Sequence, residues 1–445
     1  MAEAWAVTIR RKGPLGPEAR AFWLIVANGV LFRLYAEVFS PKRVIAAFLT
    51  QLVHRPWLVG VALAMGPAAA CLPMLAFSYA MEDRPRRMPF YYLGAQLKWI
   101  SLFITLVAII VLHARPMALA LVFIADLGVF GIGDSVSGPA FGDIVSRTIS
   151  IGRRGKMFGL RVCIGGTLAI FAGALISRLL GDHSPFGFPY NYFVLFLVAF
   201  AFLVAAQFSF MRIAEPPLEL PADARPPWRE YLRRAAAVLR HDKNAWRYTM
   251  YRNLCPLGWV PSAFIIPYAL DRLHFSAAVV GLLVSTSVVG SSVSNLAWGS
   301  LGDRHGNALV IQLSSVMLLV AAVMLAMTPI LADHGLGHGL LWWLVAVNAL
   351  GEIGLTGEGN GQLNYLYDLA PDDRVPLYIG VVTTAAAPMM IFGPLLIGWA
   401  AGRYDYFTVF VVGVIFSVAV LLSTTRLSDP MAHHRRGRQK STPSP

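Results

Sequence analysis

The sequence predicts an all-α membrane protein with twelve transmembrane helices in two pseudo-symmetric six-helix bundles. Hydrophobic residues make up 57% of the chain and charged residues 14%, whereas soluble domains carry about 25% charged residues. Apolar segments of about 20 residues, long enough to cross a ~30 Å hydrocarbon layer, recur along the whole chain. Two sets of sequence markers also repeat at an offset of half the chain, which indicates duplication.

The apolar segments follow one another with mostly short connections. We place them at residues 25–52, 57–80, 89–112, 117–142, 157–179, 190–211, 248–271, 277–300, 308–331, 340–367, 377–401 and 406–425. Arg10, Arg11 and Lys12 precede the first of them. Because this segment is too long for a signal-peptide core and lacks a small-residue cleavage site, we expect it to remain as the first span.

The basic residues of the connections predict the orientation. The N-terminal segment, the even-numbered connections and the C-terminal tail hold most of them. The odd-numbered connections hold only Arg55, Arg115, Arg178, Arg272 and Arg403. This asymmetry predicts that both termini lie in the cytoplasm, and we expect the inner membrane of a bacterium. The net charge of +13 is spread over these connections, so it does not indicate binding to nucleic acid.

The repeated markers are a proline, a glycine and an Asp-Arg pair. They occur at Pro41, Gly60 and Asp83-Arg84, and again at Pro261, Gly281 and Asp303-Arg304. The spacings are 19 and 23 residues in the first set and 20 and 22 in the second. Each proline is expected to kink its span at mid-membrane, where neighbouring helices and water satisfy the freed backbone groups.

The repeat predicts four parts of the chain: an N-terminal bundle (1–212), a central cytoplasmic linker (213–247), a C-terminal bundle (248–426) and a basic tail (427–445). The linker opens with prolines that suit an extended spacer. Its second part spaces apolar residues as in a helix, among arginines, and is either an amphipathic helix on the lipid surface or a solvated basic segment. We expect the tail to be disordered rather than bound to anionic lipid.

Ionised residues inside the spans gather on the first, fourth, seventh and tenth. They are Arg33, Glu37, Lys42, Arg43, Asp126, Asp134, Arg252, Glu352 and Glu358. Each charge at mid-bilayer costs roughly 2.5–3.5 kcal/mol, so partners or water must stabilise them, and a shared aqueous cavity is the economical interpretation. With Lys98 of the third span the set holds five cations and five acids, a balance that leaves the charge of a substrate open.

The segment GSLGDRHGN at 299–307 carries the strongest motif. It resembles the loop signature Gly-x-Leu-x-Asp-Arg-x-Gly of the major facilitator superfamily. The corresponding first-half segment MEDRPRRMP keeps the Asp-Arg pair and two further arginines but lacks the glycines. The resemblance covers nearly the whole chain and implies alternating access, with a substrate cavity lined by the four spans that carry the charges.

Acids and arginines near the cytoplasmic helix ends are candidates for a cytoplasmic gate, because charge-assisted bonds can hold two halves together and release as they rock apart. The candidates are Asp83, Arg84, Asp143, Asp303, Arg304 and Asp368. The alternative is a set of surface ion pairs, each worth about 0–1 kcal/mol.

We rank Asp134, Glu358 and Glu37 as proton carriers, in that order, because a partly desolvated acid can exchange a proton near neutral pH. The alternative for each is a permanently ionised partner of Arg or Lys. Asp134 and Glu358 occupy matching places in the two halves.

The expected function is secondary active transport of a small organic solute, coupled to protons. We expect a monomer in contact with membrane lipids, with no cofactor, and no metal site at Cys71, Cys163 or Cys255. A receptor, sensor or partner-binding protein that keeps the fold without transporting is the alternative. An enzyme is not expected, because no nucleophile with a base, nucleotide-binding loop or metal-ligand cluster occurs.

Overall fold

The computed structural model describes residues 16–81, 84–181, 184–216, 227–334, 339–370 and 375–428, and within these ranges the chain is helical, without strands. The first half contains α1 (Pro17–Val38), η1 (Pro41–Ile45), α2 (Ala46–Val53), α3 (Pro56–Met81), α4 (Met88–Leu112), α5 (Pro116–Thr148), α6 (Ile151–Leu180) and α7 (Tyr190–Met211). The second contains α9 (Lys243–Trp259), η2 (Val260–Phe264), α10 (Ile265–Asp271), α11 (Ala278–His305), α12 (Asn307–Asp333), α13 (Gly339–Leu369), α14 (Val375–Arg403) and α15 (Tyr406–Thr424), and α8 (Trp228–His241) lies between the halves.

Twelve spans are found in this part of the chain, each long and apolar enough to cross a membrane. They coincide with the twelve predicted from the sequence, so the predicted fold class is confirmed. The first span, Pro17–Val53, comprises α1, η1 and α2, and the seventh, Lys243–Asp271, comprises α9, η2 and α10.

The two predicted kinks are present as breaks in the first and seventh spans. Pro41 opens a π-helical turn and Pro261 lies within a 3-10 turn. Proline has no N–H to donate and its ring clashes with the preceding turn, so it kinks or breaks a helix. Each span is therefore divided into a long helix and a short one.

The helices of each half pack in the same pattern. In the first half α1 contacts α6 and α7, α4 contacts α5 and α7, and α3 contacts α5. In the second half α9 contacts α14 and α15, α12 contacts α13 and α15, and α11 contacts α13. Each of these contacts in one half has its counterpart in the other, as duplication requires. The residue limits of the four parts stay a prediction.

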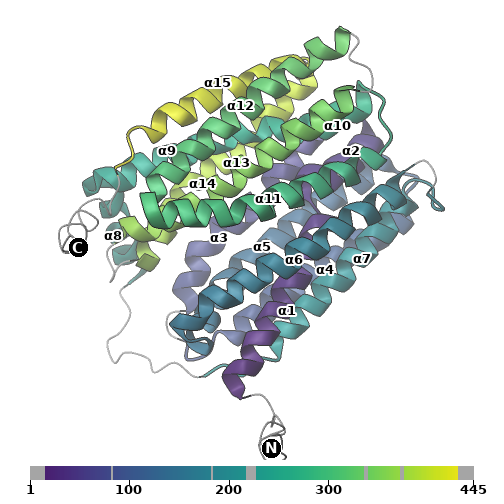
Figure 1. Ribbon diagram of the computed structural model, residues 1–445. Helices are drawn as coiled ribbons and strands as arrows, with labels where there is room; N and C mark the ends of the chain where they lie inside the picture. The colour runs from purple at the N-terminus through teal and green to yellow at the C-terminus, as the bar shows by residue number, and fades with distance from the viewer. Residues whose placement is uncertain are drawn as a thin grey trace, which may run out of the picture.

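The halves meet through α3 with α14 and α6 with α11, again a matched pair of contacts (Figure 1). Glycines make both approaches possible. A Cβ on Gly60 would lie 2.4 Å from the carbonyl oxygen of Pro394, and a Cβ on Gly281 would lie 2.3 Å from that of Gly173. Gly60 and Gly281 are two of the repeated sequence markers.

Both glycine contacts lie near one end of the molecule. Gly60 and Gly281 follow the starts of α3 and α11, while Gly173 precedes the end of α6. We call the end at which α1 begins and α15 ends the terminal end. The glycine contacts lie at the opposite end, where α2 also packs against α10.

The linker contains the helix α8, which the sequence predicted as one of two alternatives. Its apolar residues Ala235 and Val238 are buried in the protein. The ring centroid of Trp228 lies 5.0 Å from that of Tyr79 on α3, and α8 also contacts α14. This helix therefore packs on both halves at the terminal end. The predicted disordered tail lies outside the described residues.

Candidate substrate cavity between the two halves

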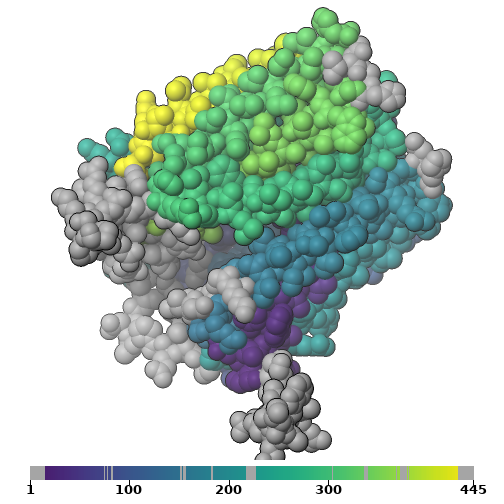
Figure 2. All heavy atoms as spheres, viewed as in Figure 1, coloured from purple at the N-terminus to yellow at the C-terminus, as the bar shows by residue number. Residues whose placement is uncertain are grey.

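A cavity of about 530 Å³ lies between the halves. Its walls come from α1, α5 and α6 on one side and α11 and α13 on the other. The lining residues are Gly29, Phe32, Arg33, Ala36, Phe141, Phe158, Arg161, Val162, Gly166, Ser291, Ser292, Asn295, Leu355, Thr356, Gly359 and Asn360. They lie in the middle and terminal-end portions of their helices, where the two halves diverge in Figure 2.

A chain of ion pairs adjoins this cavity and joins the halves. Arg33 Nη2 lies 2.8 Å from Glu37 Oε1, and Glu37 Oε2 lies 3.5 Å from Arg43 Nη1. Arg43 Nη2 in turn donates to Glu352 Oε1 on α13 at 2.5 Å. The side chains of Glu37 and Arg43 are 9% and 10% exposed, so these charges stabilise one another rather than being solvated separately.

Lys42 has a different kind of partner. Its Nζ lies 4.1 Å from the ring centroid of Trp259, a cation–π contact. Lys42 belongs to η1, and Trp259 immediately precedes η2. The two broken spans therefore touch through a cation and an aromatic ring, and η1 and η2 are themselves in contact.

Arg252 and Glu358 form a cluster inside the second half. Glu358 is 4% exposed, and its Oε1 accepts hydrogen bonds from Tyr251 Oη at 3.3 Å and Gln362 Nε2 at 3.0 Å. The carbonyl of the same Gln362 side chain accepts from Arg252 Nη1. The amide thus separates the cation from the carboxylate, and the direct partners of Glu358 are uncharged.

Asp126 and Asp134 lie where α4 packs against α5, inside the first half. Asp134 pairs with Lys98, which is buried and also donates to Ser137 Oγ at 2.9 Å. Asp126 is buried and accepts a hydrogen bond from the Thr105 hydroxyl. The third span therefore supplies partners for both acids.

The structure thus does not place all nine ionised residues in one shared cavity. They divide into the Arg43 chain, the Lys42 contact, the Glu358 cluster and the α4–α5 pairs. Of the nine, Arg33 alone is among the residues that line the 530 Å³ cavity. The difference arises because buried side chains from neighbouring spans, such as Lys98 and Gln362, satisfy charges that the sequence assigned to water.

The sequence interpretation missed Arg161, which lines the cavity from α6. It was left out because the fifth span is not one of the four expected to line the cavity. The signal was present, since an ionised residue inside an apolar span marks a functional position by default.

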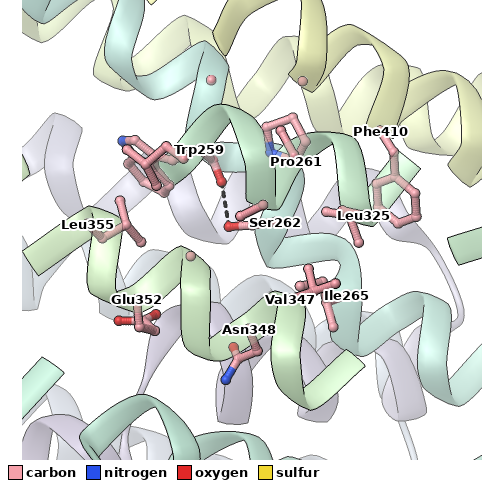
Figure 3. Close-up of a pocket in the computed structure, with 16 residues that line it drawn as sticks. Trp259, Pro261, Ser262, Ile265, Leu325, Val347, Asn348, Glu352, Leu355 and Phe410 are labelled. Atoms are coloured by element: carbon pink, nitrogen blue, oxygen red, sulfur yellow. Dashed lines mark hydrogen bonds between the residues drawn. The ribbon is translucent and has the colours of Figure 1, made fainter. Parts of the chain in front are cut away.

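A second, much smaller cavity of about 40 Å³ lies behind the break in the seventh span (Figure 3). Trp259, Pro261 and Ser262 form one wall, and Ser262 Oγ donates to the carbonyl of Trp259 at 2.6 Å. The amide of Asn348 points away from them in Figure 3 and donates to Ser287 Oγ at 2.7 Å. This space holds a few water molecules at most, whereas ligand pockets measure about 300–1,000 Å³.

Two of the gate candidates, Asp143 and Asp368, make contacts within their own half. Asp143 accepts from Arg87 Nε at 3.2 Å and from Arg147 Nη2 at 2.6 Å. At the matching place in the second half Asp368 accepts from Asn307 Nδ2 at 2.7 Å. Both acids thus tie the end of one span to its neighbours.

The other gate candidates belong to the two Asp-Arg pairs. Arg84 and Arg304 are exposed. Asp83 and the side chain of Asp303 lie outside the described part of the structure. In the described part no group of three or more His, Cys, Asp or Glu side chains is placed to hold a metal ion.

Comparison with known proteins identifies the family. A family model for the Major Facilitator Superfamily matches residues 253–445. The whole chain also has the fold of a solved D-xylose-proton symporter, with a TM-score of 0.68, 13% identity, and coverage of 93% of this chain and 99% of that one. The C-terminal part of the chain thus matches the Major Facilitator Superfamily, and the chain as a whole has the fold of its transporters. It is therefore an integral, multi-pass membrane protein with a transporter fold.

Other proteins resemble the chain in sequence. An uncharacterized protein of Mycobacterium tuberculosis (strain ATCC 25618 / H37Rv) is 24% identical over 343 residues, which cover 74% of this chain and 64% of the relative. The match thus spans less than two thirds of that relative. A multi-drug resistance efflux pump PmrA homolog of Lactococcus lactis subsp. lactis (strain IL1403) is 25% identical over 188 residues, covering 40% of this chain and 44% of the pump.

Two structures of a bacterial homologue of the iron transporter ferroportin also have this fold. The inward-facing structure has a TM-score of 0.68, with 12% identity and coverage of 92% and 98% of the two chains. The outward-facing structure has a TM-score of 0.60, with 13% identity and coverage of 93% and 99%.

Proposed function

We propose that this protein is a secondary active transporter that moves a small organic solute by alternating access, coupled to protons. In this proposal both termini lie in the cytoplasm of a bacterial cell, so the terminal end faces inward. The excess of basic residues in the connections at that end supports the assignment.

The 530 Å³ cavity carries the proposal. Its volume falls in the range of small-molecule sites, about 300–1,000 Å³. Both halves line it, as expected of a fold in which one bundle rocks against the other around a central site. The glycine contacts bring the halves together at the opposite end, which makes this conformation inward-open.

Glu358 is the acid best suited to exchange a proton. Asp134 pairs with Lys98, and Glu37 lies between Arg33 and Arg43, so their negative charge has a compensating cation. Glu358 receives hydrogen bonds from Tyr251 and Gln362 and also contacts the Cys255 thiol, and all three groups are uncharged. A buried carboxyl with uncharged partners changes its protonation state without leaving a buried cation unpaired. We therefore rank Glu358 ahead of Asp134 and Glu37.

Alternating access can be tested before a solute is known. A Cβ on Gly181 would lie 3.3 Å from the Cβ of Ala278, close to the 3.5–4.5 Å of disulfides. We would combine G181C and A278C with T356C in the cavity, after replacing Cys71, Cys163 and Cys255 with alanine. Labelling of T356C by an impermeant maleimide would be compared in right-side-out and inside-out vesicles.

The reduced protein is expected to react from both sides, and the oxidised protein only from the cytoplasmic side, because the disulfide holds the opposite end closed. The same protein without A278C is the control for oxidation. Labelling restricted to one side under reducing conditions would reject alternating access and favour a receptor or sensor that keeps the fold.

A further inference from the structure

Among the described residues, Arg161 is a cation without a compensating acid. Its guanidinium carbon lies 5.1 Å from the ring centroid of Phe141 and 5.5 Å from that of Phe158. Its Nη1 atom is buried and has no hydrogen-bond partner, and no described carboxylate pairs with it. A guanidinium held in this way is costly unless something else supplies the missing acceptor.

The remaining walls of the cavity do not supply that acceptor. No acid is among the described residues that line it. Arg33, the second cation, already pairs with Glu37 and donates to Ser291 Oγ at 3.2 Å. Arg161 adds a further cation to the balanced set of five cations and five acids described above, and it lines the cavity.

Gly29 provides the space that Arg161 occupies. A Cβ on Gly29 would lie 1.8 Å from Arg161 Nε, so any other residue at position 29 would displace the guanidinium. The facing wall is polar but uncharged: Asn295 and Asn360 meet there, with Asn360 Nδ2 donating to Asn295 Oδ1 at 2.5 Å. The cavity therefore has a cationic and aromatic side and an amide-bearing side.

We propose that the solute of this cavity is a small organic anion whose carboxylate or phosphate group binds Arg161 and whose apolar part lies against Phe141 and Phe158. The proposal rests on the transport function proposed above. Arginine suits this role because its planar donors match the oxygens of carboxylate and phosphate, and such charge-assisted bonds are among the strongest hydrogen bonds. Binding of the anion would neutralise the uncompensated charge of the cavity.

The test measures thermal unfolding of the purified full-length protein against concentration series of four probes. Phenylacetate and phenyl phosphate carry the anionic group, phenylacetamide is the uncharged analogue and phenethylamine the cationic one. A ligand that binds the folded state raises the unfolding temperature, and at a given concentration a tighter ligand raises it more. Wild type is compared with R161Q and R161K, and with R178Q, which removes an exposed charge from the same helix.

We expect the anionic probes to stabilise the wild type and R178Q, and R161Q to bind them at least about tenfold more weakly. R161K, which keeps the charge without the planar donors, should fall between. Equal affinity in R161Q and wild type would overturn the proposal. So would a wild type that is stabilised best by phenylacetamide or phenethylamine, or by none of the four probes.

If R161Q does not fold, G29A tests the proposal instead, because this variant retains Arg161 while displacing its guanidinium. Its control is G159A, whose Cβ would meet nothing within 4 Å. Short-chain phosphatidylglycerol, added in a separate series, would distinguish a lipid phosphate from a free solute at the same arginine. The maleimide experiment does not depend on the charge of the solute. A protein that shows alternating access in that experiment but binds the cationic probe best would therefore reject the anion proposal and leave the proposed transport function in place.

Discussion

The acids inside the spans differ at the scale of single residues in what neutralises them. Asp134 faces the ammonium of Lys98, whereas Glu358 faces a tyrosine hydroxyl and a side-chain amide. Removing one member of a buried ion pair leaves an uncompensated charge and costs about 3–5 kcal/mol. A glutamine in place of a protonated glutamate keeps both the size and the hydrogen-bond acceptor.

We therefore predict opposite outcomes for two amide substitutions. D134N should lower the free energy of unfolding by about 3 kcal/mol, because Lys98 stays buried without its acid. E358Q should change it by less than about 1 kcal/mol, since Tyr251 and Gln362 keep their acceptor. Unfolding in detergent micelles at neutral pH measures both.

The double variant K98Q/D134N is the control, and it should recover much of the loss in D134N because both charges are gone. A severe loss in E358Q together with a mild one in D134N would contradict this account of the two sites. It would also restore Asp134 as the first candidate for the proton carrier.

The sequence predicted the spans that carry charge but not how the charges pair. Hydropathy and the position of Arg43 in the first span are local properties. That Arg43 reaches Glu352 on α13 depends on how the two halves dock. Arg161 was missed for a related reason: its position is evident from the sequence, but its lack of a partner is visible only once its neighbours are placed.

At the scale of helices, the repeated markers predicted more than duplication. Pro41 and Pro261 lie at the breaks of the first and seventh spans, and Gly60 and Gly281 lie at the close contacts between the halves. The spacing of these residues was visible in the sequence. Their partners, Gly398 and Gly173, were not predicted, because any one glycine in a membrane helix is unremarkable.

Substitution of a contact glycine should change the balance between conformations. G281A would place a methyl group against the backbone of Gly173 and Ser177, at 2.3 and 2.4 Å, so α6 and α11 must separate. We expect T356C in this background to react more with external maleimide than T356C alone. G299A on the same helix is the control, since its Cβ would meet nothing within 4 Å. Equal labelling of both would contradict the role of the glycine contact.

A cap at the start of α15 provides a test of helix stability. Asp405 accepts from the backbone N–H of Thr408 at 3.0 Å and from its hydroxyl at 2.5 Å. Loss of such a cap costs about 1 kcal/mol, so D405A should lower the free energy of unfolding by about that amount. D405N should lose less, because asparagine also caps helices.

The hydrogen bond from the Thr408 hydroxyl lowers the pKa of Asp405 below its usual value. The cap therefore contributes its full stability above the ordinary pKa of an aspartate and loses it as pH falls through the lowered value. The difference in unfolding free energy between wild type and D405A should shrink on acidification. A difference that is unchanged at the lowest pH at which the protein folds would refute the assignment.

At the scale of the whole molecule, the proposed orientation in the membrane rests on the charged connections. Gly187, between α6 and α7, is exposed at the end opposite the termini, and Ser428, after α15, is exposed at the terminal end. With the native cysteines removed, G187C should react with impermeant maleimide in intact spheroplasts. S428C should react only after permeabilisation. The reverse result would invert the assignment of the cavity to the cytoplasm.

The contact between Lys42 and Trp259 lies where the first and seventh spans are both interrupted. An unbroken helix transmits a tilt along its full length, but a span in two pieces bends where the pieces join. The short segments α2 and α10 can stay docked against each other while α1 and α9 swing. The cavity could then narrow at the terminal end without any sliding of α2 and α10. A small bend at the two breaks would be enough to enclose a solute.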